Sequence, residues 1–282
     1  MRILVTGSQG QLGRELMRVL AADHEVDGTD LPDLDIRDGA AVRRLIEEMR
    51  PEAVIHAAAL TDTRHCEEDP DLAHQVNGIG TRNVALACRE ADAALLYVST
   101  NEVFDGQKGT PYRESDETNP INAYGRSKLA GEEEVRSLRA KRWIVRTAWV
   151  YGEGSSNFPA KILAAASQQS ELSVVTDEIA TPTWARDLAA AIAVLVEQPA
   201  YGIYHFTNGG ECSRYEWARE VLRLASREDV SIGPTTMAEY GAFPPKPPYT
   251  VLRNEAGATR LGIELRPWRE ALGERFARPL EG

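Results

Sequence analysis

Short apolar segments alternate with amphipathic stretches over the first half of the chain, and this alternation constrains the fold more than any other feature. The first apolar run is followed by residues 12–23, where apolar side chains recur at helical spacing. Repeated alternation of this kind predicts parallel strands joined by helices that cover both faces of the sheet. We therefore expect an α/β fold built on a doubly wound parallel sheet. Its strands are predicted at residues 2–7, 24–30, 53–59, 94–100 and 142–152.

The alternation loosens after Gly152, which suggests a change of domain. The segment 241–252 is rich in proline and cannot continue a helix, so we predict an extended course for it. A chain of 282 residues is long enough for one large α/β domain and a smaller lobe. We expect the sheet domain over residues 1–152, with some later elements returning to it, and a smaller C-terminal α/β lobe over residues 153–282.

Charge and cysteine content narrow the class of protein. The net charge of −11 argues against a nucleic-acid or anionic-membrane partner, because either surface would require a basic patch. The three cysteines, Cys66, Cys88 and Cys212, are far apart and lack metal-ligand spacing, which is typical of a reduced setting. The N-terminus has no charged leader followed by an apolar region, and no apolar run reaches the length of a membrane span. We expect a cytoplasmic protein.

A glycine-rich stretch, TGSQGQLGRE, lies between the first predicted strand and the first predicted helix. It places Gly7, Gly10 and Gly13 at a sharp turn, where missing side chains would let the backbone approach a pyrophosphate. The following helix would add N–H groups and the positive end of its dipole. A plain tight turn is the alternative, but the position at the first strand–helix junction favours a dinucleotide site in a Rossmann-type sheet.

An acidic residue at the end of the second strand bears on which dinucleotide binds. Asp30 stands about twenty residues beyond the glycines, where a carboxylate can accept from the adenosine ribose 2′-hydroxyl and so favours NADH. Arg14 could instead meet a 2′-phosphate, so NADH and NADPH both stay open, with a slight lean to NADH. Further predicted contacts with the dinucleotide are Gln11, Leu12, Asp35, Ile36, Ala59, Leu60 and Thr61.

Tyr124 and Lys128 are four residues apart in a predicted helix, 123–138, and are therefore neighbours on one face. The ammonium is expected to lower the pKa of the tyrosine, and the same lysine can hold the nicotinamide ribose. The stretch STNEVFDG puts Thr100 at the end of a strand, where its hydroxyl can bond a carbonyl that Tyr124 protonates while hydride arrives from the nicotinamide. The alternative is that the two residues have no catalytic role and are an exposed tyrosine beside a solvated lysine. Together with the glycine loop, however, the three residues predict a ketoreductase.

Several longer stretches resemble the dTDP-4-dehydrorhamnose reductase family of the extended short-chain dehydrogenase/reductase superfamily. The resemblance covers nearly the whole chain and is carried by NAYGRSKLAGE (122–132), RTAWVYG (146–152), ATPTWARDLA (180–189), GIYHFTNGGECSRYEWA (202–218) and the tail 246–272. It implies NAD(P)H-dependent reduction of the C4 ketone of dTDP-4-dehydro-β-L-rhamnose to dTDP-L-rhamnose. The catalytic set that it implies is Thr100, Tyr124 and Lys128. The substrate contacts that it implies near the hexose are Thr100, Asn101, Glu102 and Trp149, and those near the nucleotide diphosphate are Lys161, Lys246 and Arg253.

Two adjacent residues depart from the pattern of that family. The family usually has Asp-Tyr where this chain has Asn101-Glu102, which changes charge and shape near the sugar and leaves the identity of the keto-sugar open. One alternative is a reductase or epimerase of another nucleotide 4-keto-sugar. Another is a non-catalytic, dinucleotide-binding regulatory subunit like the methionine adenosyltransferase β subunit.

Expectations about metals and oligomers come from the resemblance alone. Some relatives bind Mg²⁺ through glutamates, and Glu15 stands at a matching place, although the sequence shows no complete metal site. His56, His65 and His74 lack metal-binding spacing. Homodimers are common in the superfamily, so a homodimer is expected by analogy.

Overall fold

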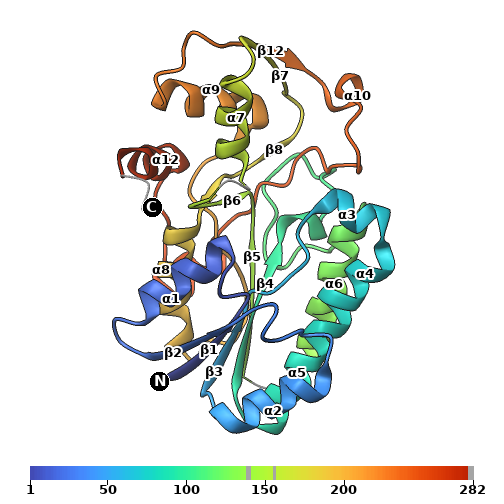
Figure 1. The fold of residues 1–282 in the computed structure, drawn as a ribbon, viewed down its shortest axis with the longest axis vertical. Coiled ribbons are helices and arrows are strands. Elements are labelled where there is room, and N and C mark those ends of the chain that lie inside the picture. The colour runs from blue at the N-terminus through green and yellow to red at the C-terminus, as the bar shows by residue number, and fades with distance from the viewer. Residues whose placement is uncertain (138–140, 155–156, 279–282) are drawn as a thin grey trace.

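The computed structural model describes residues 1–137, 141–154 and 157–278, and its central element is a six-stranded sheet (Figure 1). Its strands are β1 (Arg2–Thr6), β2 (Glu25–Thr29), β3 (Ala53–His56), β4 (Ala94–Thr100), β5 (Arg142–Thr147) and β10 (Gly202–His205). They lie in the order β10-β5-β4-β3-β1-β2, and every neighbouring pair is parallel. The predicted doubly wound α/β fold is therefore confirmed.

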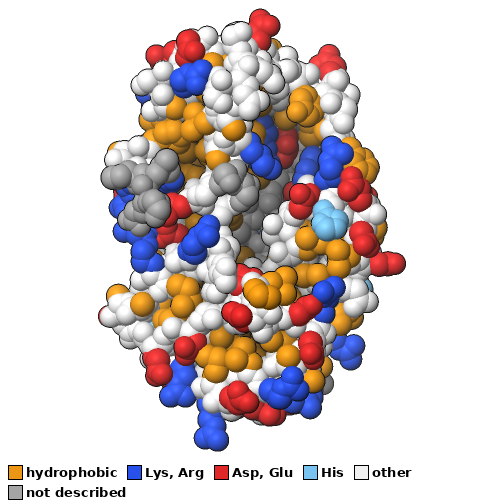
Figure 2. Space-filling view, viewed as in Figure 1, with side chains coloured by type: hydrophobic (Ala, Val, Ile, Leu, Met, Phe, Trp, Pro, Cys, Tyr) orange, Lys and Arg blue, Asp and Glu red, His pale blue; other side chains and the backbone are white. Residues whose placement is uncertain are grey.

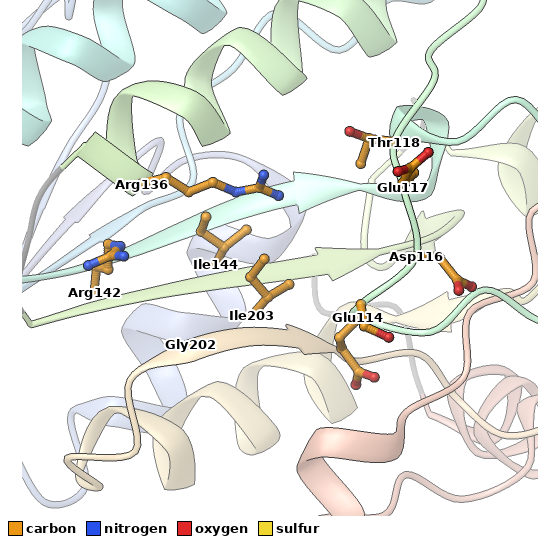
Figure 3. Close-up of a pocket in the computed structure, with 10 residues that line it drawn as sticks. Glu114, Asp116, Glu117, Thr118, Arg136, Arg142, Ile144, Gly202 and Ile203 are labelled. Atoms are coloured by element: carbon orange, nitrogen blue, oxygen red, sulfur yellow. The ribbon is translucent and has the colours of Figure 1, made fainter.

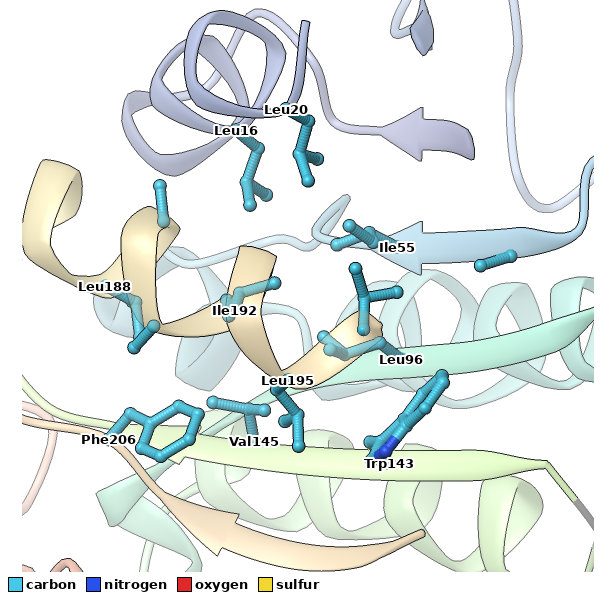
Figure 4. Packing of buried hydrophobic residues seen from close by; sticks show 14 of the residues in the cluster. Leu16, Leu20, Ile55, Leu96, Trp143, Val145, Leu188, Ile192, Leu195 and Phe206 are labelled. Carbon is cyan, nitrogen blue, oxygen red and sulfur yellow. The ribbon is translucent and has the colours of Figure 1, made fainter. Parts of the chain in front are cut away.

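Helices cover both faces of this sheet. In β1, Ile3 and Val5 join the apolar cluster on one face and Leu4 joins the cluster on the other, as the alternation of side chains along a strand requires. Figure 4 shows the first cluster, with Leu16 and Leu188 on helices that face the sheet. The helices on that face are α1 (Gln11–Leu20) and α8 (Ala185–Val196), and those on the other are α2 (Gly39–Met49), α5 (Thr81–Glu90) and α6 (Ala123–Ser137). α6 is the helix predicted at 123–138, of which residue 138 lies outside the described residues.

The strand order reverses beside β1, because β2 and β3 lie on its opposite sides. Ligands of open α/β sheets bind at such a point, beyond the carboxyl ends of the strands. Three predicted site residues follow these ends: Gly7 after β1, Asp30 after β2, and Thr100 as the last residue of β4. The topology alone thus brings these three positions to one edge of the sheet.

The fifth strand is shorter than predicted. β5 ends at Thr147 and not at residue 152, because Trp149 has a left-handed backbone (φ 44°) that turns the chain out of the sheet. The next two residues form a separate strand, β6 (Val150–Tyr151), which pairs with β9 (Thr183–Trp184). The residues around the turn, 148–150, are all apolar, and hydrophobic periodicity does not register a single left-handed residue among them.

A smaller lobe lies beyond the carboxyl edge of the sheet (Figure 1). Its helices and strands pack around the buried Trp217. Residues 241–252, which we call the strap, connect the lobe to the sheet unit, and Tyr249 bridges to Ile179 within it. The lobe contains α7 (Phe158–Ala166), β7 (Glu171–Val175), α9 (Arg214–Leu224), β12 (Ser231–Thr235) and α12 (Trp268–Ala277). The remaining short elements are α3 (Thr63–Glu68), α4 (Pro70–His74), η1 (Gln75–Gly80), η2 (Asn101–Val103), β8 (Ile179–Ala180), β11 (Cys212–Ser213), α10 (Met237–Tyr240) and α11 (Glu255–Leu261).

Cys66, Cys88 and Cys212 are all buried free thiols. Within the described ranges, no helix is both long and apolar enough to span a bilayer.

A buried ion pair joins α6 to the sheet beneath the end of β4. Arg146 on β5 donates two hydrogen bonds to the two carboxylate oxygens of Glu132, at 2.8 and 2.7 Å. Ser99 donates a third at 2.7 Å, and both charged side chains are almost inaccessible to solvent. Burial alone would raise the pKa of Glu132, but the hydrogen bonds and charge of Arg146 hold that pKa below its usual value. The pair therefore stays ionised and ties the helix to the sheet.

Removing one partner of this pair should destabilise the fold strongly. Arg146→Met leaves the Glu132 carboxylate buried without its main counter-charge, so we expect the free energy of unfolding to fall by about 3–5 kcal/mol. Removing both charges, in Glu132→Met/Arg146→Met, should recover most of that loss. Arg136→Met removes only the half-exposed partner of Glu132 and should cost less than about 1 kcal/mol. Urea denaturation measures all three, and equal losses in the single and double variants would contradict this explanation.

Candidate active site

A cavity of about 880 Å³, which we call the cleft, lies between the carboxyl edge of the sheet and the smaller lobe. Figure 2 shows the surface hollowed between these two parts. Its size is typical of sites for cofactors and small molecules. Arg253 is the one predicted site residue outside it, because its side chain lies at the surface beside Glu255. The predicted residues that line the cleft are Gly7, Gly10, Gln11, Leu12, Gly13, Asp30, Asp35, Ile36, Ala59, Leu60, Thr61, Thr100, Asn101, Glu102, Tyr124, Lys128, Trp149, Lys161 and Lys246.

The glycine loop forms one end of the cleft. A Cβ at Gly13 would lie 2.0 Å from the Gly7 carbonyl oxygen, and Gly7 itself has a φ of +72°, so neither position accepts a side chain. At Gly10 a Cβ would meet only that oxygen, at 3.2 Å, and would otherwise project into open space. The N-terminus of α1 has no side-chain cap, which leaves N–H groups of its first turn to face the cleft. This cradle, free of side chains, fits the pyrophosphate of a dinucleotide.

Asp30 and Arg14 predict opposite cofactor preferences, and only Asp30 lines the cleft. The Asp30 carboxylate lines the cleft and accepts a hydrogen bond from the Gln9 N–H (2.9 Å), so it also fixes the glycine loop. The Arg14 guanidinium lies beside Gly154, at the start of the lobe, and does not line the cleft. Only the acidic residue is therefore placed where the sequence predicts a ribose contact.

A basic residue that does lie on this rim, Arg37, was not singled out from the sequence. Arg37 lines the cleft and bonds to Asp35, with a closest distance of 2.6 Å. Its hydrogen bond holds the pKa of Asp35 below the usual value. The position of Arg37 directly after the predicted contacts Asp35 and Ile36 is the signal that could have identified it.

The segment 57–61 forms the floor of the cleft and is held by one buried amide. Asn77 Oδ1 accepts from the Leu60 N–H at 2.8 Å, and Asn77 Nδ2 donates to the Leu60 carbonyl at 2.9 Å. The same nitrogen donates to Ser127 Oγ on α6, at 2.9 Å. Asn77 thus fixes the floor relative to the helix that carries the tyrosine–lysine pair.

Two glycines let α6 approach the end of β4 closely. A Cβ at Gly125 would lie 2.2 Å from the Glu102 carbonyl oxygen, and one at Gly131 would lie 2.4 Å from the Tyr97 hydroxyl. Real Cβ atoms do not come that near, so both positions require glycine. The helix therefore lies directly against the strand end and presents its tyrosine and lysine to the cleft.

Lys128 is almost fully buried, with its Nζ 4.1 Å above the centre of the Tyr97 ring. Burial disfavours the ammonium and lowers the pKa of Lys128 to about 7, although the negative charge of Glu132 acts in the opposite direction. The lysine is thus close to its titration point at neutral pH.

The pKa of Tyr124 is shifted upward and not downward. Burial raises it well above the ordinary value, the negative charge of Glu102 adds to this, and a hydrogen bond with Thr100 partly opposes it. The predicted lowering of this pKa is therefore wrong for this structure, because burial of the phenol and the charge of Glu102 outweigh the hydrogen bond with Thr100. Tyr124 is protonated at neutral pH and able to donate a proton.

Aromatic and cationic side chains line the lobe side of the cleft. Trp217 stacks with Trp149 and with Phe158, with ring centroids 5.5 and 4.6 Å apart. The Arg214 guanidinium lies 3.7 Å from the centre of the Trp149 ring, and Lys161 lines the same side. Of these residues, Trp149 and Lys161 were predicted from the sequence, whereas Phe158, Arg214 and Trp217 were not, since they converge only through the tertiary fold.

Two further features stand apart from the cleft. Glu15, the residue matched to a Mg²⁺ ligand, is buried and paired with Arg18. The described part of the chain has no group of three or more His, Cys, Asp or Glu side chains that could hold a metal ion.

A second cavity, of about 690 Å³, lies beside β5, β10 and the loop 114–118 (Figure 3) and contains none of the predicted site residues.

The parallel sheet, the glycine cradle and the Thr-Tyr-Lys cluster define an oxidoreductase of the extended short-chain dehydrogenase/reductase class. Comparison with known proteins identifies the family of the chain. It belongs to the family described as the RmlD substrate binding domain, whose model matches residues 1–280.

Relatives match along nearly the full length of the chain. It is 42% identical to a dTDP-4-dehydrorhamnose reductase of Streptomyces griseus, over 98% of this chain and 93% of that protein. It is 38% identical to a dTDP-4-keto-6-deoxy-D-glucose reductase of Streptomyces niveus, over 98% and 96% of the two chains. A crystal structure of dTDP-4-dehydrorhamnose reductase from Bacillus anthracis in complex with NADP has a TM-score of 0.95 and 36% identity, and 98% of each chain is covered.

The second and third glycines of the loop, Gly10 and Gly13, should respond differently to substitution. Gly13→Ala forces its Cβ against backbone, so we expect the free energy of unfolding to fall by about 1–3 kcal/mol. Gly10→Ala should fold with little loss but weaken dinucleotide binding at least tenfold, because its methyl group would occupy the cradle. Thermal unfolding and fluorescence titration with NADH and NADPH measure the two effects. Unchanged affinity in Gly10→Ala would place the pyrophosphate elsewhere.

Burial of Lys128 should appear as a pH-dependent stability. Between about pH 7 and 10.5 the unfolded chain holds a proton that the folded chain has released, so the free energy of unfolding rises with pH. Compared with Lys128→Met, the wild type should gain about 2 kcal/mol between pH 7 and pH 9. Urea denaturation of both proteins across this range tests the point. A constant difference between them would show that Lys128 does not titrate there.

Proposed function

We propose that this chain is a dTDP-4-dehydrorhamnose reductase, which reduces the C4 ketone of dTDP-4-dehydro-β-L-rhamnose to dTDP-L-rhamnose with NAD(P)H. The observation that carries the proposal is the meeting of Thr100, Tyr124 and Lys128 with the glycine loop in one cleft. The names of relatives that match nearly the whole chain support the same reaction.

The three residues divide the work of carbonyl reduction. A reduced nicotinamide bound in the cleft supplies the hydride. Tyr124, kept protonated by burial, donates its proton to the carbonyl oxygen as negative charge develops there. The Thr100 hydroxyl donates a hydrogen bond to the same oxygen. Lys128 holds the ribose hydroxyls, and its positive charge stabilises the phenolate that forms on Tyr124.

The lobe side of the cleft suits the nucleotide part of the substrate. Trp149 and Phe158 offer aromatic surface to a base. Lys161 supplies positive charge for a diphosphate, and Arg214, although paired with Glu178, adds to it. The hexose then lies between this side and Tyr124, where its ketone can reach the proton donor.

The rim beside β2 favours NADH over NADPH. The Asp30 carboxylate can accept from a ribose 2′-hydroxyl and would repel a 2′-phosphate. Arg37 on the same rim is paired with Asp35 but half-exposed, so its guanidinium could still bind the 2′-phosphate of NADPH. The Bacillus anthracis relative binds NADP in its crystal structure, so both cofactors belong in the test.

Reduction of a different dTDP-4-keto-6-deoxy sugar is the second candidate function, and Glu102 in the wall of the cleft favours it. An epimerase would require a free base beside the ketone. Both oxygens of Glu102 are instead engaged, one by Lys246 and the other by Asn122. The regulatory-subunit alternative predicts dinucleotide binding without turnover.

A coupled enzyme assay tests the two candidate functions and the regulatory-subunit alternative together. The dTDP-4-keto-6-deoxy sugar is generated with and without the 3,5-epimerase, and NADH and NADPH consumption are followed separately. We expect turnover only with the epimerase present, and faster turnover with NADH. Turnover without the epimerase would indicate the second candidate, and none at all would contradict both.

Tyr124→Phe should lower kcat about 10²–10⁴-fold, because only the proton donor is lost. Its affinity for NADH should stay within about twofold of the wild type. Tyr201→Phe, which changes a tyrosine outside the cleft, is the matched control. Wild-type rates in Tyr124→Phe would assign the acid to another group.

A further inference from the structure

The two residues that depart from the family pattern are both bonded to the strap. Asn101 Nδ2 donates to Thr250 Oγ1 at 2.6 Å. One position further, the Glu102 carboxylate meets Lys246 Nζ at 3.0 Å. The strap is therefore fixed against the turn that directly follows Thr100, at the end of the cleft where the ketone must lie.

The Glu102–Lys246 pair is held by further hydrogen bonds. Lys246 Nζ donates to Thr63 Oγ1 at 2.9 Å. The fully buried Asn122 donates from Nδ2 to the second oxygen of Glu102 at 2.6 Å and to the Pro245 carbonyl at 3.0 Å. The ion pair thus sits in a fixed position relative to both the strap and the start of α6.

The pair is mostly buried, yet it lines the cleft. The side chains of Glu102 and Lys246 are 12% and 17% exposed, and both face the cavity that holds Tyr124. An ammonium has three N–H donors, and two of those of Lys246 are used. Within the described residues the third has no partner, and each carboxylate oxygen of Glu102 keeps a second lone pair.

A free donor beside free acceptors matches one chemical group particularly well. A hydroxyl can accept from Lys246 and donate to Glu102 at the same time, whereas a methyl or methylene group can do neither. A diphosphate fits less well, because Glu102 neutralises Lys246 and would repel an anion. Lys161, which lines the lobe side and has no salt-bridge partner among the described residues, is better placed for that role than Lys246.

We propose that the Glu102–Lys246 pair binds a ring hydroxyl of the hexose close to its ketone, and so selects keto-sugars that retain this hydroxyl. This inference rests on the proposed function for the class of substrate. It assigns Lys246 to the sugar and not to the diphosphate. It also gives the ion pair a function, since neither the Glu102 carboxylate nor the Lys246 ammonium alone offers both an acceptor and a donor.

Calorimetric titration of the NADH-saturated protein with dTDP-L-rhamnose and with dTDP separates the two assignments of Lys246. In Lys246→Met, and likewise in Glu102→Gln, we expect affinity for dTDP-L-rhamnose to fall at least tenfold while affinity for dTDP stays within twofold. Equal weakening for both ligands would place Lys246 on the diphosphate and overturn the proposal. Full affinity for both ligands would make the pair purely structural and overturn it as well.

Thr250→Val is the matched control, because it breaks the other bond between the strap and the turn at a residue that does not itself line the cleft. It should bind dTDP-L-rhamnose like the wild type. If it weakens binding as much as Lys246→Met does, the effect comes from the position of the strap and the proposal fails. Thermal unfolding checks that each variant is folded, and Glu102→Gln carries the test should Lys246→Met not fold.

The wild-type protein separates this inference from the proposed function. Binding of dTDP-L-rhamnose without turnover of any dTDP-4-keto sugar would refute the proposed function alone. An active reductase whose variants keep full affinity would refute the inference alone. A wild type that does not bind dTDP-L-rhamnose would refute both.

Discussion

The candidate site depends on the absence of side chains where α6 meets β4. At Gly125 and Gly131 the helix backbone lies so near the strand end that even one methyl group would overlap the Glu102 carbonyl or the Tyr97 hydroxyl. An alanine at either place would push the helix outward and move Tyr124 with it. The position of Tyr124, the proposed proton donor, thus depends on this backbone packing.

This close packing also buries the ionisable groups of the region, and burial shifts their pKa values. The Glu132 carboxylate has Arg146 as its counter-charge, whereas Lys128 faces mainly the Tyr97 ring. Burial, helped by the positive charge of Lys128, lowers the pKa of the neighbouring His56 to about 3, so that imidazole is neutral. A neutral phenol and a weakly held lysine proton therefore share one cleft, and environments that push pKa values apart in this way are typical of acid–base sites.

Local patterns in the sequence predicted the sheet, the glycine loop and the Tyr124–Lys128 pair, because strand alternation, the strand–helix junction and a four-residue spacing are all short-range features. Effects that depend on surroundings were less accessible. The sign of the Tyr124 pKa shift follows from burial and from Glu102, and the left-handed Trp149 leaves no trace in hydrophobicity. Arg253 has the residue type expected of an anion contact, but the fold places it at the surface.

The strap joins positions that are remote in the chain, since its bonds to Asn101 and Glu102 span 149 and 144 residues. Loops of that size close late, because their entropy must be overcome before the contact contributes any energy. During synthesis, the glycine loop and α6 emerge long before residue 246. The part of the site proposed to hold a dinucleotide is therefore complete in sequence well ahead of the part proposed to discriminate among sugars, and such selectivity would be the last property that the growing chain acquires.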